Sequence, residues 1–145
     1  AAKRRAAVGA GLASPKAGGV ANPRTQEGRW KLLGSALRID RQAALQSTSW
    51  GLGQVMGCHW EILGYASVEA LVEDARSGAG GQARLMLRFI DRNGMREMLN
   101  AHQWERFALR YNGPAYQRNA YHLKLAAAYR RHAGAAQAGC HGQAS

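Results

Sequence analysis

The sequence predicts an all-α protein. In several segments apolar residues recur at i, i+3, i+4 and i+7, which is the period of one helix face. No segment alternates apolar and polar residues in the way that a half-buried strand does. The length of 145 residues suits one compact domain.

The first 26 residues predict an irregular basic arm. They contain five basic residues, no acidic residue, and prolines at Pro15 and Pro23. No apolar period is present that would give a helix a core-facing side. We therefore expect residues 1–26 to lie outside the helical domain.

The helical domain is predicted to span residues 27–132. The first helix runs from Arg29 to Ile39, and its inward-facing residues are Trp30, Leu33 and Leu37. Asp40 is placed to cap a second helix, which ends near Ser47. Further along, Ser67 is a plausible N-cap for a helix that buries Val68, Leu71 and Val72.

The second half of the domain is also helical by its pattern. A helix carrying Leu85, Met86, Phe89 and Ile90 stops at Asn93-Gly94, and a short helix begins near Met95. The period of Trp104, Phe107, Ala108 and Tyr111 predicts another, which ends at Asn112-Gly113-Pro114 because proline restricts its predecessor. A last helix is expected from Ala115 to His132, followed by a disordered tail over residues 133–145.

The charge predicts affinity for polyanions. Twenty Lys and Arg against nine Asp and Glu give a formal net charge of +11, so nucleic acid, anionic lipid and the anionic bacterial envelope are all candidate partners. No run of about 18 apolar residues exists that could span a membrane, and we see no secretory signal in the first residues. The chain is expected to be a monomer.

Metal and thiol chemistry are not expected. The five histidines and two cysteines show no zinc-like spacing. For Cys58 and Cys140 we favour one partly buried thiol and one tail thiol over a disulfide. We therefore predict no cofactor and no metal.

The most specific motif is the glycine-rich segment from Ser49 to Gly57. It offers five candidate substrate-binding residues: Ser49, Trp50, Gly51, Gln54 and Met56. An aromatic ring, glycines that allow close approach and an amide that donates and accepts are the parts of a carbohydrate subsite. The alternative is a tight turn between helices in which Trp50 is a core residue.

A second motif lies at the break between the last two predicted helices. Here Tyr111, Asn112 and Tyr116 could form the opposite wall of a glycan groove. The alternative is an ordinary helical corner with amphipathic tyrosines.

Taken together, the two motifs resemble a known family. The order Ser-x-Gly-Leu-x-Gln and then Tyr-Asn-Gly is similar to goose-type lysozymes and lytic transglycosylases. More closely, Ile39–Gly57 and the run WERFALRYNGPAYQRNAYHLKLAAAY from Trp104 to Tyr129 resemble the N-acetylmuramidase domain of phage and prophage endolysins. The resemblance covers about Ser14 to Tyr129.

The resemblance implies a lysozyme-like helical fold that lacks its N-terminal helices. It also implies cleavage of the β-1,4 bond between N-acetylmuramic acid and N-acetylglucosamine in peptidoglycan. In that family the catalytic acid is a glutamate in a Glu-Ser motif ahead of the glycine-rich segment, and this chain contains no Glu-Ser dipeptide. The catalytic residue is therefore unknown, and Glu27, Asp40 and Glu61 are weak substitutes that read better as loop, cap and surface carboxylates.

Three functions remain open at this level. The first is an endolysin-type muramidase, prophage-encoded, made in the bacterial cytoplasm and acting on the periplasmic or extracellular wall after release. The second is a non-catalytic relic that binds glycan. The third is a small basic protein that binds nucleic acid, for which only non-specific binding is expected, since Arg84, Arg88 and Arg92 form a solvated helix face.

Overall fold

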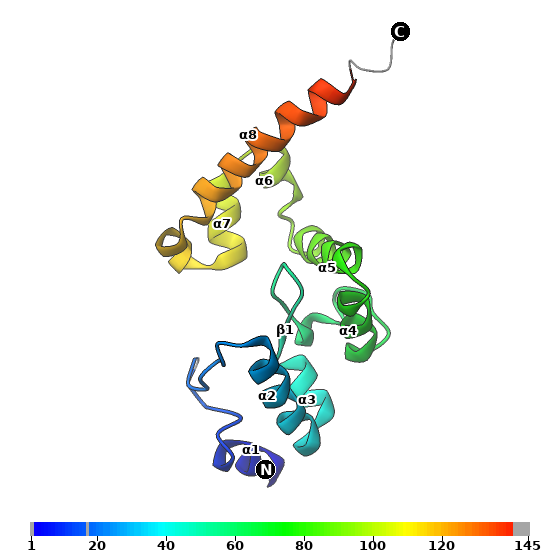
Figure 1. The fold of residues 1–145 in the computed structure, drawn as a ribbon, viewed down its shortest axis with the longest axis vertical. Coiled ribbons are helices and arrows are strands. Elements are labelled where there is room, and N and C mark those ends of the chain that lie inside the picture. Colours follow the sequence, from blue (N-terminus) through cyan, green and yellow to red (C-terminus); the bar gives the residue numbers. More distant parts are fainter. Residues whose placement is uncertain (1, 17, 141–145) are drawn as a thin grey trace. The chain divides into compact units, whose positions relative to one another are not determined.

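The computed structural model describes residues 2–16 and 18–140, and its elements are nearly all helical (Figure 1). The chain divides into two compact units, Ala1–Phe89 and Ile90–Ser145. The elements in chain order are α1 (Ala2–Gly9), α2 (Gln26–Ile39), α3 (Arg41–Gln46), β1 (Ser49–Trp50), β2 (Val55–Met56), the 3-10 turn η1 (Gly57–His59), α4 (Val68–Arg76), α5 (Ala79–Arg92), α6 (Arg96–Asn100), α7 (Trp104–Asn112), the 3-10 segment η2 (Pro114–Asn119) and α8 (Tyr121–Cys140).

The prediction of an irregular arm is wrong for the first residues, because Ala2–Gly9 forms helix α1. Alanine, lysine and arginine are strong helix formers, so this segment is helical by propensity although it buries no residue. The prediction at the other end also needs correction. Helix α8 continues to Cys140, into the segment predicted to be a disordered tail, whereas residues 141–145 lie outside the described part.

The predicted caps of the first unit are confirmed. The Asp40 carboxylate accepts a hydrogen bond from the Ala43 N–H at 3.1 Å and begins α3. The Ser67 hydroxyl accepts from the Ala70 N–H at 3.1 Å and begins α4. Each oxygen satisfies a backbone donor that has no partner within its helix, which fixes where the helix starts.

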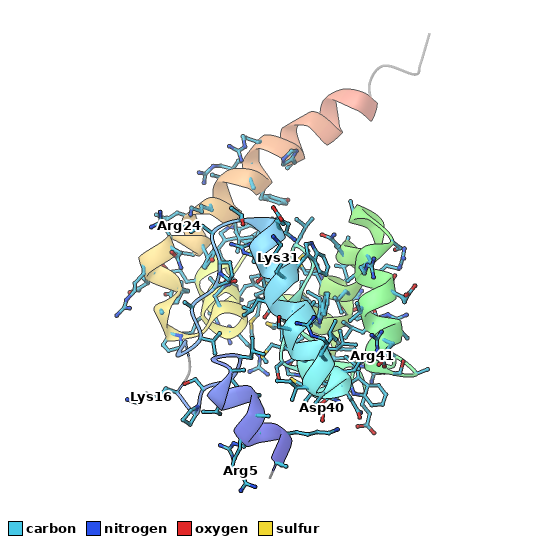
Figure 2. All side chains as sticks on the ribbon, turned by 60° about the horizontal axis from the view of Figure 1, so that its bottom comes forward. Arg5, Lys16, Arg24, Lys31, Asp40 and Arg41 are labelled. Atoms are coloured by element: carbon cyan, nitrogen blue, oxygen red, sulfur yellow. The ribbon has the colours of Figure 1, made fainter. Side chains whose placement is uncertain are left out.

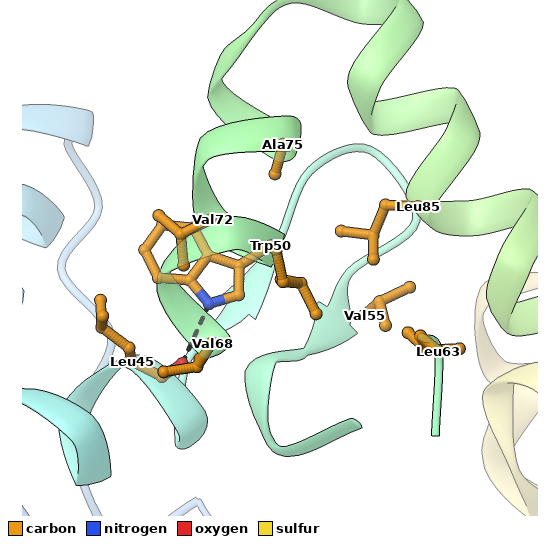
Figure 3. Close-up of a cluster of buried hydrophobic side chains, with 9 residues drawn as sticks. Leu45, Trp50, Val55, Leu63, Val68, Val72, Ala75 and Leu85 are labelled. Atoms are coloured by element: carbon orange, nitrogen blue, oxygen red, sulfur yellow. Dashed lines mark hydrogen bonds between the residues drawn. The ribbon is translucent and has the colours of Figure 1, made fainter. Parts of the chain in front are cut away.

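The core of the first unit lies where α3, α4, the β-hairpin and α5 meet (Figure 3). Its buried members are Leu45, Trp50, Val55, Leu63, Val68, Leu71, Val72, Ala75 and Leu85. The predicted inward residues of α4 are therefore confirmed. Leu33 and Leu37 of α2 pack against this core, but Trp30, predicted to face inward with them, keeps 48% of its surface exposed.

A polar cluster joins α4 to α5 beside this core. The Tyr65 hydroxyl donates to Asp74 Oδ2 at 2.7 Å, and Arg84 Nε donates to Asp74 Oδ1 at 3.2 Å. Burial by itself raises the pKa of Asp74, but the hydrogen bonds from Arg84 and Tyr65 outweigh it and hold that pKa below its usual value. The carboxylate therefore stays ionised and keeps the two helices together at neutral pH.

The second unit is built from α6, α7, η2 and α8. Helix α7 packs against η2 and α8, and it buries Phe107 and Ala108 as its period predicts. The prediction of a single helix that starts at Ala115 is wrong about where the helix begins. The chain forms η2 first, and Ala120 then adopts a left-handed backbone conformation with φ of 50° before α8 begins. Within the described part of the chain, no helix is long and apolar enough to cross a membrane.

Replacing Trp50 with phenylalanine tests the core. The indole Nε1 donates to the Leu45 carbonyl oxygen at 3.0 Å, so Trp50→Phe leaves a buried acceptor without its donor and a partly filled space. We expect the free energy of unfolding to fall by about 2–3 kcal/mol. Urea denaturation measures it, and Trp30→Phe, at a half-exposed site, is the control and should cost less than about 1 kcal/mol. Equal losses in the two variants would contradict this description of the core.

Candidate functional site

The glycine-rich motif forms a β-hairpin, which the all-α pattern did not predict. Strands β1 and β2 pair antiparallel, with Ser49 opposite Met56 and Trp50 opposite Val55. Gly51 has a φ of 68°, a backbone conformation that residues with a side chain rarely adopt. A Cβ at this position would also lie only 3.1 Å from Gln82 Cγ, so both the backbone and the neighbouring side chain disfavour a larger residue. The Gly51 backbone thus lies close to the Gln82 side chain, and its close approach to a sugar stays a prediction.

Gln54 is held in an unusual conformation at the end of this turn. Its φ is 51°, a left-handed value that costs a non-glycine residue about 1–2 kcal/mol. Both its backbone N–H and its side-chain amide donate to the Gly51 carbonyl oxygen, at 3.2 and 3.1 Å. Strained residues of this kind cluster at functional sites, and the Gln54 side chain remains exposed at the hairpin.

Trp50 is a core residue rather than an exposed platform. Only 6% of its surface is exposed, and its indole is tied to the Leu45 carbonyl (Figure 3). This burial favours the alternative interpretation of the motif for this one residue. The other four candidates around it, Ser49, Gly51, Gln54 and Met56, are exposed or half-buried.

A cavity of about 1550 Å³ lies beside the hairpin and within the first unit. Helices α1, α2 and α3, the loop between α1 and α2, the hairpin, the end of α4 and Gln82 of α5 contribute to its walls. All five candidates of the glycine-rich motif line it, although Trp50 is almost entirely buried. The structure therefore brings these residues to one concave surface.

Trp30 is the aromatic residue that the motif analysis missed. It lines the same cavity, its ring centroid lies 6.5 Å from that of Trp50, and half of its surface is open. The helical period placed it on the apolar face of α2 but could not show that this face ends at a cavity. Gln82 was missed as well, because its Oε1 accepts from the Leu52 N–H across 30 residues of sequence.

Asp40 is the one carboxylate among the described lining residues of this cavity. The Ala43 N–H and the Lys3 ammonium, whose Nζ lies 3.0 Å from Oδ2, hold its pKa below the usual value. A glycosidase acid needs the opposite shift, since it must carry a proton near neutral pH. Glu27 pairs with Lys31 at 2.7 Å, and Glu61 is exposed; neither lines the cavity.

The second predicted motif lies in the second unit. Burial raises the pKa of Tyr111 to about 12, and its ring stacks on Phe107 with centroids 5.4 Å apart. Asn112 is exposed at the last position of α7, whereas Tyr116 is buried in η2 and its hydroxyl accepts from the Gln117 amide at 3.3 Å. The role of these three residues as a groove wall stays a prediction.

Among the described residues, no group of three or more His, Cys, Asp or Glu is arranged to hold a metal ion. Cys58 is a free thiol and is exposed, which corrects the expectation of partial burial. The predicted absence of a bond to Cys140 concerns a side chain outside the described part.

The helical fold, with its glycine-rich hairpin beside a cavity, is that of a lysozyme-like protein. Residues 4–133 match the family model described as Muramidase: N-acetylmuramidase, so the chain belongs to the N-acetylmuramidase family. The match starts ahead of the Ser14 at which the resemblance of the motifs begins.

A solved structure supports the same assignment. The chain aligns with the crystal structure of the Burkholderia AP3 phage endolysin with a TM-score of 0.73. The two sequences are 35% identical, and the alignment covers 92% of the present chain. The alignment covers 54% of that endolysin chain, so the present chain spans about half of its length. No curated protein matches the chain.

The protonation of Asp40 can be measured directly. Because its pKa is depressed in the folded state, its stabilising effect is present above the unfolded value of about 3.9 and is lost as pH falls through the folded value. We expect NMR titration of the carboxyl carbon to place the pKa below that unfolded value, and Lys3→Ala to raise it. A pKa raised above the usual value would contradict the assignment of Asp40 as a cap and restore it as a candidate acid.

Proposed function

We propose that this protein acts in endolysin-type lysis of the bacterial cell wall and that its first unit recognises peptidoglycan glycan strands. The reaction is the family's hydrolysis of the β-1,4 bond between N-acetylmuramic acid and N-acetylglucosamine. The observation that carries the proposal is the cavity beside the hairpin, in a chain whose residues 4–133 match the N-acetylmuramidase model.

The lining of the cavity suits a sugar chain. Trp30 offers an exposed ring for the apolar face of a pyranose. Ser49 and Gln54 offer a hydroxyl and an amide for ring hydroxyls and N-acetyl groups, and the strained turn fixes the position of Gln54. These groups are held by a buried core, so little ordering is required when the ligand binds.

Glycan binding and glycosidic bond cleavage require different groups. Hydrolysis of a glycosidic bond needs a carboxylic acid that stays protonated beside the leaving oxygen. The described lining supplies only Asp40, whose pKa is lowered, and the chain contains no Glu-Ser dipeptide. We therefore assign glycan binding to the described cavity and leave the proton donor unassigned.

The proposed place of action follows from the substrate. The protein is made in the cytoplasm of a prophage-carrying bacterium and meets the wall on the periplasmic or extracellular side after release. Its basic surface favours an anionic envelope and gives only salt-sensitive, non-specific contact with nucleic acid.

Incubation with insoluble peptidoglycan tests the proposal. We expect the chain to be retained on sedimented peptidoglycan, and mass spectrometry of the supernatant tests whether it also releases muropeptides. Trp30→Ala should weaken retention about tenfold, and Ser49→Ala or Gln54→Ala about threefold each, from the loss of ring contact and single hydrogen bonds.

Leu52→Ala is the matched control, because Leu52 lies in the same hairpin turn, is 76% exposed and does not line the cavity. Its retention should equal that of the parent chain. Fragments with reducing N-acetylmuramic acid ends would show the proposed hydrolysis and the presence of a proton donor, whereas anhydro ends would indicate a lytic transglycosylase. Absence of retention would contradict the proposed function.

A further inference from the structure

The cavity beside the hairpin concentrates positive charge. Its described lining residues include a single carboxylate, Asp40, and five basic side chains that come from four separate parts of the first unit: Lys3, Arg4, Lys16, Arg29 and Arg76. The first two belong to α1, the third to the turn after it, and the others to α2 and α4. The fold therefore gathers these cations from across the sequence, and a run of basic residues in the chain does not account for them.

Most of this charge has no counter-ion within the described protein. Lys3 pairs with Asp40 at 3.0 Å, whereas Arg29 Nε donates to the neutral Pro23 carbonyl at 3.0 Å. None of the ion pairs between described residues involves Arg4, Lys16 or Arg76. Like charges that share a concave surface repel one another more than they do in bulk water, and an anion bound among them relieves that repulsion.

Some basic residues outside the cavity have carboxylate partners. Lys31 pairs with Glu27 at 2.7 Å, and Arg41 pairs with Glu69 at 3.5 Å. Arg5, the sequence neighbour of Arg4, projects away from α2 and does not line the cavity (Figure 2). Arg24 is likewise outside the lining. The chain thus supplies arginines of similar exposure that differ in whether they face the cavity.

We propose that the cavity selects an acidic glycan, in which carboxylates of the muramic acid lactyl group or of its peptide stem pair with these cations. The inference rests on the proposed function and narrows its substrate class. Because Trp30, Ser49 and Gln54 share the cavity with the cations, a sugar ring and a carboxylate can be bound side by side. A neutral N-acetylglucosamine oligomer can contact Trp30, Ser49 and Gln54 but has no carboxylate to pair with the basic side chains.

Calorimetric titration of the full chain with three soluble ligands tests the inference. The ligands are a disaccharide-tetrapeptide muropeptide, the same muropeptide with its carboxylates amidated, and a neutral N-acetylglucosamine tetramer. We expect the carboxylated ligand to bind about tenfold more tightly than the amidated one in low salt. The difference should shrink in about 0.5 M NaCl, because salt screens partly exposed charges.

Two double variants with equal charge change locate the effect. Arg4→Glu with Lys16→Glu should abolish the preference for the carboxylated ligand, whereas Arg5→Glu with Arg24→Glu should retain it. Thermal melts establish that each variant folds. Equal loss of the preference in both variants, or equal affinity for all three ligands in the parent chain, would overturn the inference while leaving glycan binding in place.

The remaining outcomes separate the two proposals. Absence of binding by all three ligands contradicts the proposed function itself, which the peptidoglycan retention assay tests independently. Displacement of the muropeptide by a short DNA duplex at equal charge concentration would mean that the cavity takes any polyanion, and this would also overturn the inference. Failure of the duplex to compete supports it.

Discussion

The hydrogen bond from the Trp50 indole to the Leu45 carbonyl joins the end of α3 to the first strand of the hairpin. On the other side of the same turn, Gly57 lies so close to Leu45 that a Cβ would overlap the carbonyl oxygen. The short strands between these two contacts have little pairing of their own, so the buried indole holds them. Ser49, Gln54 and the cavity that they line depend on that one anchored ring.

The same constraint explains why the two tryptophans have different roles. Trp50 fills the space between α3, α4 and α5, and its polar atom is satisfied inside. Trp30 lies against it but remains half exposed at the cavity. A buried ring thus supports an exposed one, which is the arrangement that a stacking platform needs in order to remain rigid. The cavity around them is basic, and Asp40, the one carboxylate among its described lining residues, is a charged helix cap.

The helices could be predicted from the sequence because their signals are local. The apolar periods gave α2, α4 and α7, and the caps at Asp40 and Ser67 follow from short side chains that accept from nearby N–H groups. The hairpin was missed because two-residue strands carry no alternation. Helix α1 was missed because it has propensity but no buried face. The lining of the cavity was predicted in part. Five residues of one motif line the cavity, whereas the exposure of Trp30 and the convergence of Arg4, Lys16 and Arg76 depend on tertiary packing that no local pattern contains.

The central claim is that the surface beside the Trp50-anchored hairpin binds glycan. NMR titration of the labelled chain with a peptidoglycan tetrasaccharide tests it most directly. The account predicts that the Trp30 indole N–H and the Ser49 and Gln54 amides shift together along one saturable curve. The Trp50 indole N–H, which is bonded to Leu45, should move little. Shifts confined to residues outside the cavity, or a Trp50 signal that moves while Trp30 does not, would contradict it.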